Sequence, residues 1–226
     1  SIEDYRQYLL SEDDLERIRS DNNLRLSVIE NGISKNDPIS ERYFEGKYIT
    51  PYDKGGESNA VGGWMPNYWV PTDYFIDWSE GAVDCLLNDG RIREGSSRPY
   101  PRNIDSYFTC GITFSSRGVY APTFRAHCGA VYDKESSSIF AKRNVSGLLG
   151  LLASRAAKYI LKGILQQTVS MDVDALKELP IPKQDQDLEL LVMSIFRNQK
   201  SDPRYDYASN EQLEIDRLVY EAYGLN

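Results

Sequence analysis

The sequence predicts an α+β fold, in which a twisted, β-rich core is buttressed by one long helix and by helices at the carboxy-terminal end. Three observations lead to this prediction. Apolar residues recur at helical spacing over residues 145–165. Short apolar and aromatic runs, separated by clusters of Gly, Pro, Asn and Ser, fill residues 43–145. Two amphipathic segments follow at 185–198 and 209–223.

Residues 1–42 are predicted to be a helical and linker segment that continues a longer parent chain. Ser11 can cap a helix, because carboxylates follow it at Glu12, Asp13 and Asp14, where they favour the helix dipole. The alternation of apolar residues over 24–28 is typical of a strand.

Residues 43–183 are predicted to form the central domain, with a long helix at about 145–165 that we call the hub helix. Gly147, Gly150 and Ala157 are small enough to let another element approach the backbone of the hub helix closely. Short strands are expected in five runs, 47–49, 74–78, 112–114, 130–132 and 139–140.

Residues 184–226 are predicted to be a carboxy-terminal helical appendage. Ser209 is a candidate cap for its second helix, and Gly224 is a candidate end.

Composition narrows the classes of function. The chain has 226 residues, and 41% of them are hydrophobic, which suffices for a packed core. One histidine and three cysteines without metal-ligand spacing predict no zinc site, and reduced thiols are the simpler interpretation of the cysteines. Three charges interrupt the apolar run of the hub helix, so no membrane span is expected. We therefore expect a cytoplasmic protein with no membrane partner.

The charge distribution permits binding to nucleic acid. The net charge of −8 argues against it at first. Residues 91–145, however, contain nine basic and four acidic residues, a local net charge of +5. An acidic body with a basic centre is compatible with a DNA surface on one side of the molecule, and equally with chance clustering.

Several motifs in a fixed order resemble one known family. They are Tyr52-Asp53-Lys54-Gly55-Gly56, Phe75–Gly81, Gly-Ile-Thr-Phe-Ser at 111–115, Leu-Leu-Gly-Leu-Leu-Ala-Ser at 148–154 with Asp174–Pro182, and Glu214–Leu225. Together they resemble the target recognition domains of restriction-modification proteins. These include the carboxy-terminal specificity domains of adenine-specific DNA methyltransferases and the specificity subunits of type I systems.

The resemblance implies recognition of a short double-stranded DNA sequence for methylation of adenine N6. The parent protein would use S-adenosylmethionine, in restriction-modification or another phage-defence system. The chain has no Asn/Asp-Pro-Pro-Tyr/Phe motif and no Gly-rich cofactor fingerprint, so no catalytic residue and no cofactor site are expected in it. Met65-Pro66-Asn67-Tyr68 is interpreted as a loop. The methyltransferase catalytic domain is expected before Ser1 in the same parent chain.

DNA contacts are predicted at nine positions, because Arg and Asn read base edges and Lys neutralises phosphate. These residues are Lys54, Arg91, Arg93, Arg98, Arg102, Asn103, Arg117, Lys142 and Arg143. Arg102 is our first candidate for a base reader, since Pro101 and Asn103 place it in a turn. Trp64 and Tyr68 lie in a Gly/Pro-rich loop, and are candidates to wedge into DNA or to stack on a base.

Two other functions are compatible with parts of the sequence. Glu45-Gly46-Lys47, with Asp37 upstream, has the Glu-x-Lys form of metal-dependent nucleases. Such a triplet occurs by chance in most chains, so no nuclease site is predicted. The alternative of a different class is a protein-interaction module that docks a partner subunit through its helices. A basic concave surface would favour DNA, whereas an exposed apolar stripe on the terminal helices would favour a protein partner.

Overall fold

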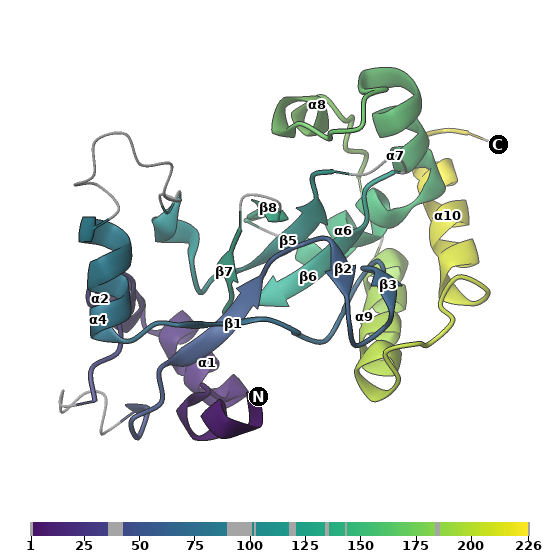
Figure 1. Cartoon of the computed structure of the whole chain (residues 1–226). Helices are drawn as coiled ribbons and strands as arrows, with labels where there is room; N and C mark the ends of the chain where they lie inside the picture. The colour runs from purple at the N-terminus through teal and green to yellow at the C-terminus, as the bar shows by residue number, and fades with distance from the viewer. Residues whose placement is uncertain are drawn as a thin grey trace. The chain divides into compact units, whose positions relative to one another are not determined.

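The computed structural model confirms an α+β fold, with helices and several small sheets (Figure 1). The structure describes residues 2–35, 43–89, 101, 103–117, 121–133, 136–142, 144–183 and 186–225. Contacts divide the chain into two compact units. Unit 1 comprises residues 1–53, 74–109 and 128–131, and unit 2 comprises residues 54–73, 110–127 and 132–226. The described helices of the predicted carboxy-terminal segment, residues 184–226, belong to unit 2.

Unit 1 combines short helices with a small sheet. Its helical elements are η1 (Ile2–Tyr8), α1 (Glu12–Ser20), α2 (Asn22–Asn31), α4 (Glu80–Asp84), the π-helical η2 (Cys85–Asp89) and η3 (Ile104–Ser106). Its sheet has the order β4-β1-β7, with β1 at Ile49–Asp53, β4 at Phe75–Asp77 and β7 at Val131–Tyr132. β1 and β4 are antiparallel, with Thr50 opposite Ile76.

The predicted cap of α1 is confirmed. The Ser11 hydroxyl accepts a hydrogen bond from Asp14 N, and the Asp14 carboxylate accepts one from Ser11 N, which completes a capping box. The Lys47 ammonium lies 3.1 Å from the same carboxylate. Burial alone would raise the pKa of Asp14, but the hydrogen bonds from Ser11 and Lys47 outweigh it and lower that pKa.

The strand predicted around Leu24 is wrong, because the segment forms α2. The Asp21 side chain accepts hydrogen bonds from Asn23 N and Leu24 N, and so begins a helix there. Leu24 and Val28 lie one helical turn apart and are both buried. The Trp78 indole donates to Val28 O at 2.8 Å and fixes α2 within unit 1.

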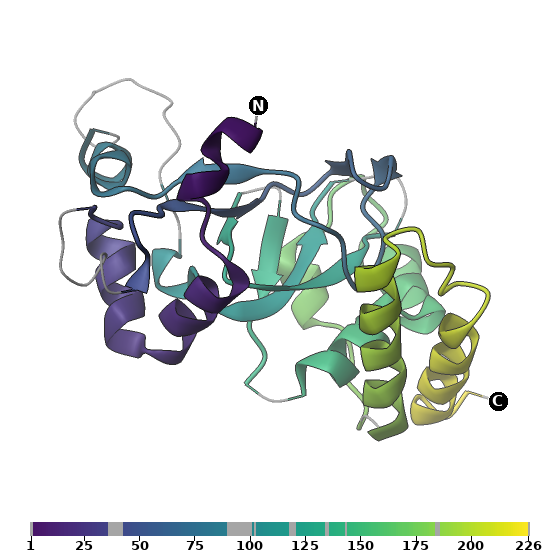
Figure 2. The same cartoon turned by 90° about the horizontal axis from the view of Figure 1, so that it is seen from below.

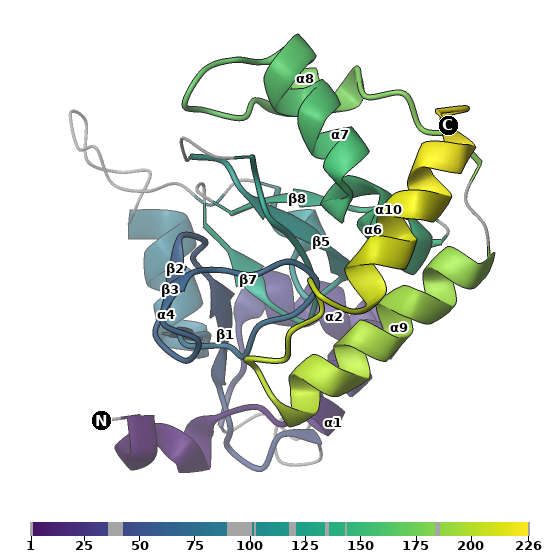
Figure 3. The same ribbon diagram turned by 90° about the vertical axis from the view of Figure 1, so that its right-hand side faces the viewer.

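Unit 2 contains a second sheet and a group of helices. The sheet has the order β6-β5-β8, with β5 at Cys110–Ser115, β6 at Phe124–Cys128 and β8 at Ser136–Ile139. A separate hairpin pairs β2 (Glu57–Ser58) with β3 (Gly63–Trp64). The helices are α6 (Val145–Ala153), α7 (Arg155–Tyr159), the π-helical η4 (Ile160–Leu165), α8 (Val173–Lys177), α9 (Gln186–Ser201) and α10 (Glu211–Ala222). Figures 2 and 3 show α9 and α10 side by side.

The predicted hub helix is not continuous. It breaks at Ser154, which has an extended conformation between α6 and α7. The Ser154 hydroxyl donates to Leu151 O at 2.7 Å and accepts from Ala157 N at 3.2 Å. One side chain therefore ends α6 and begins α7, which is why an apolar pattern of helical period is interrupted here.

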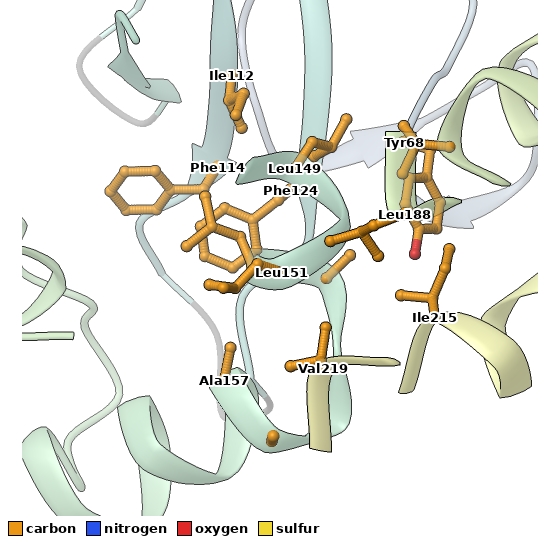
Figure 4. Close-up of a cluster of buried hydrophobic side chains, with 14 of the residues drawn as sticks. Tyr68, Ile112, Phe114, Phe124, Leu149, Leu151, Ala157, Leu188, Ile215 and Val219 are labelled. Carbon is orange, nitrogen blue, oxygen red and sulfur yellow. The ribbon is translucent and has the colours of Figure 1, made fainter. Parts of the chain in front are cut away.

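The core of unit 2 forms where α6, α9 and α10 meet β5 and β6 (Figure 4). Gly150 allows this approach as predicted, since an added Cβ would lie 3.0 Å from Leu188 Cδ1 and from Val192 Cγ2 of α9. Gly147 serves a different purpose, because a Cβ there would meet the side chain of Asn144 at 2.6 Å. The Asn144 side chain caps α6 by accepting from Gly147 N.

Two smaller predictions are wrong. Ser209 does not cap α10, whose N-cap position is Asn210 with no capping side-chain bond. Cys110 and Cys128 are each disulfide-bonded, so the prediction of reduced thiols is wrong for them, whereas Cys85 is exposed. Gly224 follows α10 with a φ of +70°, in the conformation that favours glycine at a helix end. Among the described helices, none has the length and apolar character needed to cross a membrane.

Candidate functional site

The nine predicted DNA contacts are only partly covered by the structure. Arg91, Arg93, Arg98, Arg102 and Arg143 lie outside the described residues. Lys54, Asn103, Arg117 and Lys142 are described, and all four are exposed. Asn103 belongs to unit 1, where its φ of +52° precedes η3, and the other three belong to unit 2.

Arg117 and Lys142 do not form one cluster. β5 and β8 are antiparallel, with Ile112 opposite Ile139 and Ser115 opposite Ser136. Arg117 follows the end of β5, and Lys142 follows the opposite end of the ladder. Extending this register separates them by about eight residues, or roughly 26 Å at about 3.3 Å per residue. These two cations therefore cannot contact the same phosphate.

The turn that carries Lys54 has the geometry that its glycines predict. Gly55 and Gly56 have φ values of +70° and +82°, which other residues rarely adopt. Nothing would obstruct a Cβ at Gly56, so the backbone conformation alone requires glycine there. Met65 N donates to Gly56 O at 3.2 Å. This bond joins the turn to the hairpin that carries Trp64.

The two aromatic candidates have opposite environments. Trp64 is 60% exposed at the end of β3. Tyr68 is 0% exposed, and Figure 4 shows its ring among the core residues of unit 2. Its hydroxyl donates to Gln212 Oε1 at 2.7 Å. The prediction that Tyr68 stacks on DNA is therefore wrong for this conformation, because the ring faces the core.

Asp73 holds the β2–β3 hairpin in place. Its carboxylate accepts hydrogen bonds from Ser58 Oγ at 2.8 Å, from Asn59 N at 2.6 Å and from Ala60 N at 3.2 Å. Gly62 and Gly63 complete the turn with φ values of +72° and +108°. Trp64 is thus presented to solvent by a hairpin with a defined conformation.

A groove of ≈ 290 Å³ lies between this hairpin and the loop that joins α9 to α10. We call it the aromatic groove. It is lined by Val61, Gly62, Trp64, Pro66, Gln199, Pro203, Arg204, Tyr205 and Tyr207. All of these residues belong to unit 2. It combines an indole, two phenols and a guanidinium in one small concave surface.

Buried amides support the floor of the aromatic groove. Gln199 is 0% exposed; its Oε1 accepts from Trp69 N at 3.0 Å, and its Nε2 donates to Asn67 O at 3.2 Å. The Tyr207 hydroxyl accepts from Asn67 N at 3.2 Å. Asn67 Oδ1 in turn accepts from Phe124 N of β6. Residues 65–69 are therefore tied both to the sheet and to α9.

The opposite wall is also held by hydrogen bonds. Asp202 Oδ1 accepts from Arg204 N at 2.9 Å, and the Tyr205 hydroxyl donates to Glu211 Oε2 at 3.0 Å. Desolvation and the neighbouring Glu211 raise the pKa of Tyr205. The wall is preorganised before any ligand arrives.

Arg204 differs from the other arginines that the structure describes. Arg155 and Arg217 form ion pairs with carboxylates, and Arg25 donates to backbone carbonyls. Within the described part of the chain, Arg204 is the arginine whose guanidinium has neither a hydrogen bond nor an ion pair. Its five donors are therefore available to a ligand in the aromatic groove.

The Glu-x-Lys triplet has structural partners. Glu45 and Gly46 have φ values of +49° and +78°, which are typical of a turn. The ammonium of Lys47 is paired with Asp14 in the capping box of α1. Asp37 lies outside the described residues. The arrangement of Glu45 and Lys47 thus matches a turn beside a helix start.

Sequence reasoning missed the part of the aromatic groove that follows α9. The signal was the run Pro203-Arg204-Tyr205-Asp206-Tyr207, which interleaves aromatic, cationic and proline residues between two helices. The aromatic groove forms only when this run lies beside Trp64, which is about 140 residues earlier in the sequence. The hydrogen bond from Asn67 N to the Tyr207 hydroxyl joins the two segments. Such a long-range pairing leaves no local pattern.

Comparison with known proteins finds no family model that matches the chain and no curated protein with significant similarity to it.

Proposed function

We propose that the chain is the DNA target-recognition module of an S-adenosylmethionine-dependent adenine-N6 methyltransferase. The parent protein would act in restriction-modification or another phage-defence system. Catalysis and cofactor binding would belong to a methyltransferase domain of the same parent chain. The proposal rests on the ordered motifs, and one observation carries it furthest. The Lys54 turn, with its left-handed glycines, adjoins a fixed hairpin that presents Trp64 beside Arg204.

These side chains suit a nucleic acid. Lysine neutralises phosphate, and arginine binds phosphate or a guanine edge through two parallel hydrogen bonds. An exposed indole offers a face on which a base can stack. Lys54, Arg117 and Lys142 are assigned to phosphates in this proposal, because each is exposed in unit 2 and the last two are too far apart to read one base pair.

Salt-dependent binding of a duplex tests the proposal. Affinity for fluorescein-labelled duplex DNA is measured by anisotropy between low and moderate salt. Each phosphate contact contributes about 0.9 to the slope of log affinity against log salt. Lys54→Ala should therefore flatten that slope by about one unit on every sequence. Lys177→Ala is the matched control, since this exposed lysine of α8 lies outside the predicted set of DNA contacts and should leave the slope unchanged. An unchanged slope for Lys54→Ala would contradict the phosphate role.

A specific observation also favours the alternative of a protein-interaction module. Leu190 and Met193 lie one turn apart on α9 and are 59% and 46% exposed. Leu213 and Tyr220 lie two turns apart on α10 and are 54% and 38% exposed. Each helix therefore presents apolar surface to solvent, which is typical of a docking face.

Measurements of co-purification and of affinity for duplex DNA distinguish DNA recognition from protein interaction. If the helices dock a partner subunit, replacing Leu190 and Met193 by lysine should abolish co-purification with that subunit. The same double variant should keep the full affinity of the chain for duplex DNA. If the chain binds no duplex DNA under any salt condition while co-purification is lost, the protein-interaction function replaces our proposal.

A further inference from the structure

We infer that the aromatic groove binds one unpaired nucleotide of a DNA strand, with its base against Trp64 and its phosphate at Arg204. This inference rests on the proposed function, because it takes DNA as the ligand. It adds to recognition of a duplex a separate site that only a nucleotide outside the base stack can enter.

Trp64 is exposed although its hairpin is held in place. A large apolar side chain that is 60% exposed gains little from the fold, yet Asp73 holds its hairpin through three hydrogen bonds. The indole face thus has a defined position before binding. Stacking of a base on an aromatic ring depends on such a face, and it tolerates any base because every base has a π-face.

The lining of the aromatic groove carries its charge at Arg204. Asp202 and Asp206 lie in the same loop but do not line the groove, and no other described residue neutralises the Arg204 guanidinium. Glu57 is the cross-strand partner of Trp64, so its carboxylate belongs to the same face of the hairpin and would repel a phosphate there. A nucleotide would therefore place its base on the hairpin and its phosphate at Arg204.

The aromatic groove is small and open to solvent. Its volume of ≈ 290 Å³ is near the lower end of ordinary ligand sites, which span about 300–1,000 Å³. A groove of this size can take a single base against the indole. Bonds from Gln199 and Tyr207 fix the floor, so binding needs little reorganisation of the protein.

A proline-rich peptide is the competing ligand for a groove with Trp, Tyr and Pro in its lining. Such a peptide carries no phosphate and needs no unpaired guanidinium, so Arg204 favours the nucleotide. Binding of such a peptide is one of the outcomes that the test distinguishes.

The test compares two DNA duplexes of equal length, one perfect and one with a single unpaired thymidine in its centre. Affinity of the full chain for each is measured by anisotropy, and the quenching of tryptophan fluorescence is recorded in the same titration. We expect the duplex with the unpaired nucleotide to bind more tightly and to quench more. Trp64→Ala should weaken binding of this duplex by roughly 5- to 150-fold, as expected for loss of one base stack. It should leave the perfect duplex unaffected.

Matched variants separate stacking and charge from damage to the fold. Trp64→Phe keeps a ring and should retain most of the preference, and Tyr159→Ala removes a 69% exposed aromatic residue of α7 outside the groove and should change nothing. Arg204→Gln should reduce the preference, whereas Arg197→Gln, on the exposed side of α9, should not.

Four results would overturn the inference. If both duplexes bind equally, or if Trp64→Ala weakens both by the same factor, the groove holds no unpaired nucleotide while the proposed function stands. If neither duplex nor any other DNA binds, the proposed function fails and this inference fails with it. If a proline-rich peptide binds and Trp64→Ala abolishes that binding while DNA does not compete, the groove is a peptide site.

Discussion

Replacing Tyr68 by phenylalanine should destabilise unit 2 without affecting DNA binding. The side chain is fully buried, and its φ of +74° is uncommon for a residue other than glycine. Its hydroxyl donates to Gln212 Oε1 at 2.7 Å, and Gln212 Nε2 donates to Asp216 Oδ1 at 3.1 Å. Asp216 Oδ1 also accepts from Arg155 N at the start of α7. Tyr68 is therefore the first donor in a buried chain of hydrogen bonds that reaches α7 and α10.

The expected loss of stability in the variant comes from one unpaired buried group. Tyr68→Phe removes no apolar volume, but it leaves the buried Gln212 Oε1 without its donor. A buried acceptor that loses its partner costs about 1–3 kcal/mol. In a chain of this size each kcal/mol lowers the melting temperature by about 2–4 °C. We expect a loss of about 2 kcal/mol, measured by urea denaturation with circular dichroism.

A double-mutant cycle isolates the bond. Gln212→Met removes the acceptor at similar volume, so the double variant should be less destabilised than the sum of the single variants, by about 0.5–3 kcal/mol. Tyr159→Phe, on the exposed surface of α7, should have no effect on stability. The reasoning is refuted if Tyr68→Phe is as stable as the unchanged chain. It is also refuted if the variant loses DNA affinity at unchanged stability, because Tyr68 would then act as a stacking residue.

Burial raises the pKa of Tyr68 well above 10, so the folded state keeps its proton where the unfolded state loses it. The free energy of unfolding should therefore fall as pH rises above about 10. If it falls equally steeply in the Tyr68→Phe variant, this assignment is contradicted. The lowered pKa of Asp14 predicts a contribution present above its unfolded pKa and lost as pH falls below about 4. The stability difference between the unchanged chain and Lys47→Met should therefore shrink in acid, and a constant difference would argue against the assigned contact. Gly32→Ala should destabilise the chain far more than Gly56→Ala in thermal melts. Both glycines have positive φ, but a Cβ at Gly32 would lie 2.8 Å from the backbone of Glu80, whereas Gly56 has open space; equal losses would show that only φ matters.

Local signals predicted the parts of the fold that short stretches of chain decide. Ser11 with carboxylates after it predicted the start of α1, and Gly55-Gly56 predicted a left-handed turn. Both depend on residues within four positions of one another. The strand expected around Leu24 is wrong because its apolar pattern was ambiguous. Apolar residues at 24 and 28 fit the period of a strand and also the period of a helix. The cap at Asp21 decides between them.

Tertiary contacts decided the rest. Trp64 and Tyr68 are four residues apart and similar in chemistry, yet one is exposed and the other is buried. Tyr68 packs in the core of unit 2, and its hydroxyl donates to Gln212, more than 140 residues later in the chain. The aromatic groove depends on pairings of the same range. The break at Ser154 was also hidden, because a serine within an apolar helical pattern can either face solvent or cap a new helix.

Selection of duplexes from a random pool tests most directly whether the chain reads DNA sequence. The immobilised chain is incubated with duplexes that contain a randomised central segment, at a salt concentration where phosphate contacts alone bind weakly, and the retained pool is sequenced. We predict that one short sequence is enriched, and that Lys54→Ala retains the same sequence with a lower yield. A retained pool with the base composition of the input, at every salt concentration, would contradict the proposal that this chain recognises a DNA target.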